Sequence, residues 1–208
     1  YTAMQFPLRR GTVNKSSRQL VSLFADQDKF RFLQLLMLST LVALCASSAP
    51  VELHILPHTH ADVGWLQTVN SLARLNVSRI LDGVVEELWT RPRRRFVWDE
   101  MAFLQYWWDN DAHASEKASF LELVRSKRLE FDDNGWSQHD MGATTLDSML
   151  NNWVEGHEWI RTNLGAAHEP RIGWSLDPFG MSATQAALQS MMGMDGWFFT
   201  RLSADIIE

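Results

Sequence analysis

The sequence predicts an α/β fold in which a parallel sheet is covered by helices. Two observations support it. Short runs of β-branched and aromatic residues alternate with longer segments of helical periodicity from residue 50 to residue 208. Polar side chains also follow the end of each of the first four predicted strands. Alternating strands and helices indicate βαβ units. No linker rich in Gly, Pro or Ser divides residues 50–208, so we expect one domain, an unclosed part of a barrel.

The predicted strands are short apolar runs. The first, Val51–Leu56, has the composition of a buried strand and leads directly into a polar motif. The others follow at intervals that leave room for a helix between each pair: Phe96–Trp98, Leu129–Phe131, Arg171–Ser175 and Trp197–Thr200.

Helical periodicity fills the intervals between these strands. In residues 66–90 apolar side chains recur every three or four positions, which predicts an amphipathic helix. Ser182 is placed to cap the last helix, because its hydroxyl can accept a hydrogen bond from a free backbone N–H. The further predicted helices are Met101–Trp108, Ala114–Ser126, Thr144–Leu164 and Ser182–Met192.

The N-terminal part has the layout of a secretory signal. Lys29 and Arg31 precede the apolar run Phe32–Cys45, and small residues follow it. The run is too short for a comfortable membrane span, although a buried helix or a membrane anchor is the alternative. We therefore expect residues 1–49 to be leader and signal peptide, with the mature chain beginning between Ala46 and Pro50.

Composition excludes some functions. The net charge is −6 and the one basic cluster is Arg91–Arg95, which argues against nucleic acid as a partner. Cys45 is the single cysteine, so no disulfide can form within the chain. Asn76 begins an Asn-Val-Ser sequon and could carry a glycan in a secreted protein.

The motif after the first strand is the strongest indication of chemistry. His58, His60 and Asp62 alternate, so an extended backbone points all three side chains to one side. Imidazole and carboxylate groups in that arrangement can share a divalent cation such as zinc. His58 taken alone is better explained as a structural residue.

Polar residues follow the later strands as well, and in a parallel barrel these ends converge on one face. Asp99 and Glu100 could instead cap the next helix, and Asp177 could be a turn residue before Pro178. The groups expected at this face after the first strand are Asp99, Glu100, Asp132, Asp133, His139, Asp140 and Asp177.

Four motifs in order resemble glycoside hydrolase family 38, the retaining α-mannosidases of lysosome and Golgi, with the lysosomal branch closer. The likeness spans about residues 51–202. It rests on these segments: His58–Trp65, Phe96–Trp108, Leu129–Asp140 and Asp177–Gly180.

The resemblance implies a role for six residues. His60 and Asp62 would be zinc ligands, and Asp177 would be both a zinc ligand and the catalytic nucleophile. Trp65, Phe179 and Arg201 would line the mannose subsite. The resemblance further implies a seven-stranded parallel β/α barrel of which this chain is the N-terminal part. The substrates would be terminal α-mannosyl residues of N-glycans or oligomannose, in the lysosome or outside the cell.

Departures from the family pattern leave alternatives open. Ala61, Met141 and Met181 stand where the family usually has polar residues. The family's acid/base Asp and a further zinc-binding His would come after Glu208, so we expect this piece to be inactive alone. A non-catalytic sugar-binding copy is one alternative. A metal-dependent amidohydrolase or deacetylase is another, but the Asp177–Gly180 motif argues against it.

Overall fold

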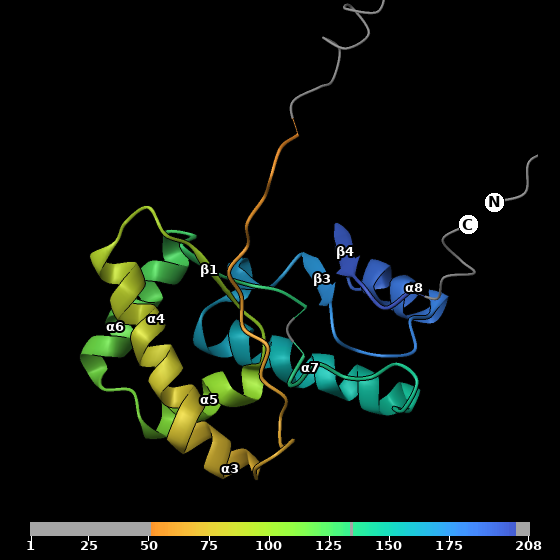
Figure 1. Cartoon of the computed structure of the whole chain (residues 1–208), viewed down its shortest axis with the longest axis horizontal. Coiled ribbons are helices and arrows are strands. Elements are labelled where there is room, and N and C mark those ends of the chain that lie inside the picture. Colours follow the sequence, from red (N-terminus) through yellow and green to blue (C-terminus); the bar gives the residue numbers. More distant parts are fainter. Residues whose placement is uncertain (1–50, 134, 203–208) are drawn as a thin grey trace, which may run out of the picture. The chain divides into compact units, whose positions relative to one another are not determined.

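The structure is a computed structural model that describes residues 51–133 and 135–202. The chain divides into two units, Tyr1–His54 and Ile55–Glu208, and every helix and strand discussed below belongs to the second. The predicted signal peptide, the predicted mature N-terminus and Cys45 lie outside the described residues. Figure 1 shows the course of the chain.

The described strands form two parallel pairs. β1 (Phe96–Trp98) pairs with β2 (Leu129–Phe131), and β3 (Ile172–Ser175) pairs with β4 (Gly196–Phe199). The N–H of Asp133 donates to the carbonyl of Ile172 at 2.9 Å, which links the end of β2 to β3. The predicted α/β class with parallel strands is therefore confirmed, and four of the five predicted strands are present.

The predicted first strand, Val51–Leu56, is wrong. Its residues form no strand, and Ile55 is 81% exposed. Parallel pairing begins later: Val97 N donates to Pro57 O at 3.0 Å, and Thr59 N donates to Val97 O at 3.2 Å. An apolar run becomes a strand only where a neighbouring strand supplies hydrogen bonds. The short β1 supplies them to Pro57 and Thr59, which follow the predicted strand.

The predicted helix over residues 66–90 is present as three joined segments: α3 (Val69–Leu72), a π-helical turn η1 (Ala73–Val77) and α4 (Ser78–Thr90). The remaining α-helices also match the periodicity: α5 (Met101–Asn110), α6 (Ala114–Arg125), α7 (Leu146–Asn163) and α8 (Ala183–Met191). A 3₁₀ turn that the sequence did not predict, η2 (Ala166–His168), follows α7. Ser182 caps α8 as predicted, since its hydroxyl accepts from Gln185 N at 3.2 Å.

The hydrophobic core lies among α4, α5, α6 and the β1–β2 pair, which Figure 1 shows gathered together. Aromatic side chains supply much of it. Trp107 packs against Phe120 with ring centroids 5.5 Å apart, and both are fully buried. The Trp107 indole N–H donates to Asp82 at 2.7 Å, so the buried ring keeps its hydrogen bond. Core packing thus accounts for part of the high tryptophan content.

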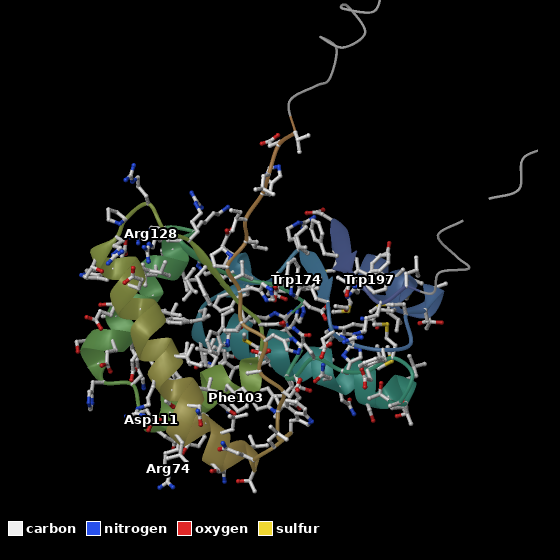
Figure 2. The ribbon with its side chains drawn as sticks, in the orientation of Figure 1. Arg74, Phe103, Asp111, Arg128, Trp174 and Trp197 are labelled. Atoms are coloured by element: carbon white, nitrogen blue, oxygen red, sulfur yellow. The ribbon has the colours of Figure 1, made fainter. Side chains whose placement is uncertain are left out.

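The β3–β4 pair carries aromatic residues of its own. Trp197 donates through its indole N–H to the Ser175 hydroxyl at 3.0 Å, across the two strands. The ring of Trp174 on β3 packs at a tilt against that of Phe198 on β4, with ring centroids 5.8 Å apart. Figure 2 labels Trp174 and Trp197 on this part of the molecule. These contacts fix β3, whose end leads into the Asp177 motif.

Candidate active site at the strand ends

Two hydrogen bonds tie the first polar motif to the end of β1. The hydroxyl of Thr59 accepts from Asp99 N at 2.9 Å, and Ala61 N donates to Glu100 Oε1 at 2.6 Å. Glu100 precedes α5 but makes no capping hydrogen bond to it with its side chain. The alternative that Glu100 merely caps the helix is therefore wrong. Its side chain instead holds the backbone between His60 and Asp62.

The structure brings His60, Asp62 and Asp177 together. The Nε2 atom of His60 lies 3.4 Å from Asp62 Oδ1 and 3.3 Å from Asp177 Oδ2. One ligand atom from each of the three residues lies within 4.8 Å of the other two. Residues from two distant parts of the chain thus form one potential metal-binding group.

His58 does not join this group. Its ring packs edge-on against Trp174, with centroids 4.9 Å apart, and its Nδ1 lies 2.7 Å from the carbonyl oxygen of Thr59. His58 therefore has the structural surroundings that the sequence favours for it.

Asp177 carries a second partner on its other oxygen. Arg201 donates to Asp177 Oδ1. The Arg201 guanidinium, followed by the nearby His60, holds the pKa of the Asp177 carboxyl below its ordinary value. The guanidinium also lies 4.0 Å from the ring centroid of Phe179, a cation–π distance. The Asp177 carboxyl is therefore ionised at neutral pH.

The loop that carries Asp177 is fixed by close backbone contact with the loop after β2. Phe179 N donates to Asp140 Oδ1 at 2.7 Å, and Phe179 O accepts from Met141 N at 2.9 Å. Gly180 has φ of +79°, and a Cβ there would lie 2.4 Å from Gly142 N. Only glycine fits this approach. Asp140 thus braces the Asp177 loop through its side chain, a role the sequence did not reveal.

A cavity of about 770 Å³ opens beside this loop. It is lined by Leu176, Phe179, Gly180, Met181, Thr200, Arg201 and Leu202. Two of the predicted substrate residues, Phe179 and Arg201, therefore lie on one cavity. Trp65 is not among its lining residues and is 73% exposed. Its role in binding sugar stays a prediction.

Carboxyl groups at the ends of β1 and β2 lie deeper. Asp99, Glu100, Asp132 and Asp133 are all buried. Burial raises the pKa of each of them, and that of Asp133 rises to about 7. Asp133 accepts hydrogen bonds from Gln189 at 2.8 Å and from the indole of Trp153 at 3.2 Å, which oppose the shift. The sequence placed these residues at the mouth of the fold, but not this far inside.

His139 takes no part in the His60 group. Its ring nitrogens lie 3.2 Å from Gln185 Oε1 and 3.1 Å from Asn152 Nδ2, between α7 and α8. Burial lowers the pKa of His139, so the neutral ring is favoured. The expectation that His139 joins the polar group is therefore wrong.

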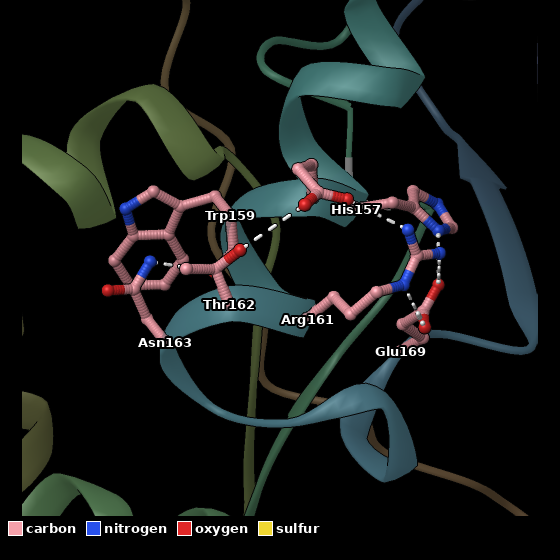
Figure 3. A network of polar contacts seen from close by, with 7 residues as sticks. His157, Trp159, Arg161, Thr162, Asn163 and Glu169 are labelled. Carbon is pink, nitrogen blue, oxygen red and sulfur yellow. Dashed lines mark hydrogen bonds and ion pairs between the residues drawn. The ribbon is translucent and has the colours of Figure 1, made fainter.

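A separate ionic network joins the end of α7 to the residues after η2, as Figure 3 shows. Glu169 accepts from Arg161 at 2.8 Å, and its Oε2 lies 3.3 Å from His157 Nδ1. The hydrogen bonds from Arg161 hold the pKa of Glu169 below its ordinary value against the effect of burial. This network supports α7, against which the loop after β2 packs.

The strand ends therefore hold an imidazole and two carboxylates that could bind a metal ion, beside an arginine and an aromatic ring. The sequence profile of the glycosyl hydrolases family 38 N-terminal domain matches residues 50–207. The chain belongs to this family.

Relatives agree with this membership. The chain is 39% identical to lysosomal alpha-mannosidase of Bos taurus, over 73% of this chain and 16% of the relative. It is 36% identical to lysosomal alpha-mannosidase of Cavia porcellus, over 94% of this chain and 21% of the relative. It is 34% identical to alpha-mannosidase 2 of Spodoptera frugiperda, over 71% of this chain and 13% of the relative. The aligned part thus spans only a small share of each relative's length.

A solved structure supports the fold. The crystal structure of an alpha-mannosidase from Enterococcus faecalis V583 superposes with a TM-score of 0.60 at 16% identity, covering 69% of this chain and 16% of that one. At this identity the likeness concerns the fold alone.

Proposed function

We propose that this chain is part of the catalytic domain of a zinc-dependent retaining α-mannosidase acting on terminal α-mannosyl residues of N-glycans or oligomannose. One observation carries the proposal. His60, Asp62 and Asp177 converge from distant parts of the chain, and Arg201 pairs with the remaining oxygen of Asp177. Membership of glycosyl hydrolases family 38 argues against the amidohydrolase alternative.

The donor set fits zinc. An imidazole nitrogen and two carboxylate oxygens are ligands that zinc accepts, and three protein ligands leave a position open. Zinc bound there would hold sugar hydroxyls and offset negative charge beside the nucleophile.

Asp177 has the surroundings of a nucleophile. Its pKa is held low, so its oxygen carries the charge needed to attack the anomeric carbon while the glycosidic bond breaks. Arg201 and Phe179 lie beside it on the cavity wall, where they would position the sugar. We propose no general acid among the described residues for protonating the leaving oxygen.

We also propose that the complete fold is a seven-stranded barrel and that the protein enters the secretory pathway. The exposed apolar residues of β4, Phe198 and Phe199, suit a strand that further strands of a seven-stranded barrel would cover. The lysosomal relatives support the secretory pathway, with the lysosome or the extracellular space as destination. In the described part of the chain, no helix has the length and apolar character needed to cross a membrane.

Zinc calorimetry tests the metal site. His60→Ala should remove most zinc binding by the full chain, because His60 is the only imidazole of the group. His54→Ala is the matched control: that exposed histidine lies 3.5 Å from Glu52 and outside the group. Equal zinc affinity of His60→Ala and wild type would contradict the assignment.

Covalent trapping tests the nucleophile in a longer version of the protein that has activity. A 5-fluoro mannosyl fluoride should label Asp177, since electron withdrawal slows hydrolysis of the glycosyl-enzyme. Asp177→Ala should abolish the label. Asp195→Ala should keep it, although Asp195 also pairs with an arginine, Arg171, at 2.5 Å. A label on another carboxylate would contradict the proposal, and sugar binding without any turnover would favour the non-catalytic copy.

A further inference from the structure

Three buried carboxyl groups lie behind His60 with oxygen atoms that accept no hydrogen bond. Asp99 and Glu100 follow β1, and Asp132 follows β2. Each is at most 3% exposed. The oxygens without a hydrogen-bond partner are Asp99 Oδ2, Glu100 Oε2, Asp132 Oδ1 and Asp132 Oδ2. Because β1 and β2 are parallel neighbours in register, the groups meet at one edge of the pair.

Their surroundings contrast with those of Asp133 in the same loop. Asp133 receives two side-chain hydrogen bonds, from Gln189 and from Trp153. Asp132 receives none from an amide or an indole, and the side chain that faces it and can share a proton with it is the carboxyl of Asp99. A buried ionised carboxylate without a partner costs several kcal/mol, so either a shared proton or a bound cation must balance this cluster.

A second set of potential ligand atoms lies at the same place. One nitrogen of His60 and one oxygen each from Asp99 and Glu100 lie within 4.8 Å of one another. This set differs from the His60–Asp62–Asp177 group in its carboxylates, which are buried here and half-exposed there. Asp132 is buried beside Asp99 and is not one of this set.

We propose that Asp99, Glu100 and His60 bind a second divalent cation, of the oxygen-preferring class that includes Mn²⁺, Mg²⁺ and Ca²⁺, and that Asp132 supports this site from beside Asp99. Carboxylate oxygens from two residues are ligands that such ions favour, and His60 adds the one nitrogen that Mn²⁺ accepts readily. The cation balances the buried charge and fixes Glu100, which holds the Ala61 backbone. His60 belongs to both sets of ligands, so the two sites are neighbours.

Mn²⁺ binding to the full chain tests the proposal. After removal of metals with EDTA and dialysis at pH 7, the wild type should bind two equivalents of Mn²⁺, counted from the electron paramagnetic resonance signal of the free ion. Asp132→Asn should keep one equivalent and weaken the other at least about tenfold. Asp62→Asn should remove the other equivalent, and this arm tests the proposed zinc site separately.

A single Mn²⁺ equivalent in the wild type, unchanged in Asp132→Asn, would overturn the proposal and mean that a shared proton balances the carboxyl groups. Thermal unfolding gives an independent readout. Mn²⁺ should raise the melting temperature of the wild type more than that of Asp132→Asn or of Asp99→Asn. An equal rise in all three proteins would also overturn it. Without metal, both variants should unfold no earlier than the wild type, because each removes buried charge.

Discussion

Two regions of this molecule differ in how completely they bury their apolar side chains. The β1–β2 half (α4, α5, α6, β1 and β2) encloses Phe120 entirely, whereas the β3–β4 half (β3, β4 and α8) leaves Phe198 58% exposed. The site draws on both. His60 and Asp62 are tied to the end of β1, while Asp177 and Arg201 flank the β3–β4 pair. The candidate metal-binding group therefore connects a well-buried core to a sheet whose apolar side chains are more exposed.

The largest expected effect compares the same side chain in the two halves. Phe120→Ala should lower the free energy of unfolding by about 3–5 kcal/mol, because it opens a cavity beside Trp107 and Phe131. Phe198→Ala should lower it by about 1 kcal/mol, the value of its tilted ring contact with Trp174. Denaturant unfolding measures both. Equal losses would remove the distinction between the halves.

The pH dependence of stability gives a second test, at Asp133. This carboxyl accepts hydrogen bonds from Trp153 on α7 and Gln189 on α8. Burial raises its pKa from 3.8 to about 7 in the folded state. Folding therefore favours the neutral form of Asp133. The stability that this group contributes to the fold is fully present below about pH 4 and is lost as the pH rises through about 7.

In EDTA, the free energy of unfolding of the wild type should fall with pH across this window, with up to about 1.4 kcal/mol per pH unit from this one group. Asp133→Asn should reduce the slope. Asp147→Asn, an exposed acid at the start of α7, should leave it unchanged. Parallel pH profiles for Asp133→Asn and the wild type would refute the assignment.

Two glycines test the contact that connects the Asp177 loop to the loop after β2. Gly180 and Gly193 both have positive φ, +79° and +88°, but only Gly180 would place a Cβ against backbone. Gly193→Ala should cost about 1 kcal/mol for conformation alone. Gly180→Ala should cost more and should also weaken zinc binding, since Phe179 and Asp177 would move. Similar losses, with zinc affinity intact, would show that the contact does not position the site.

The smallest effect is expected on the exposed surface of the β3–β4 half. Met191 is 83% exposed at the end of α8, so Met191→Ser should change the free energy of unfolding by less than about 0.5 kcal/mol. Met149→Ser on α7, where the side chain is 5% exposed, should cost several times more. A large loss for Met191→Ser would mean that this face packs more tightly than its exposure indicates.

The helices and most strands could be predicted from the sequence, because local residue patterns determine them. Periodicity located the helices and four strands, because core-facing residues must recur at the spacing of each element. It failed at Val51–Leu56, where a strand depends on a neighbour and not on composition. The convergence of His60, Asp62 and Asp177 followed from parallel strand order and the family resemblance, although their metal binding remains a prediction.

How deeply each polar side chain is buried could not be predicted from the residue pattern. Gln185 and Gln189 lie almost fully buried on α8, and both bond polar groups inside the fold. Such side chains look like surface residues in a sequence. Nothing in the spacing of Asp99, Asp132 and His139 distinguishes a solvated loop from a buried one, since tertiary packing decides it, as α7 and α8 do for His139.

The π-helical turn η1 bears on how this fold tolerates changes in chain length. A π turn holds one residue more than an α-helical turn, and here it lies between two α-helical segments with Ala73 and Val77 both in the core. Deleting one exposed residue of the turn, such as Leu75, would restore a continuous α-helix while both ends kept their buried faces. The helix thus contains a position where insertions and deletions can accumulate during evolution without disturbing the core.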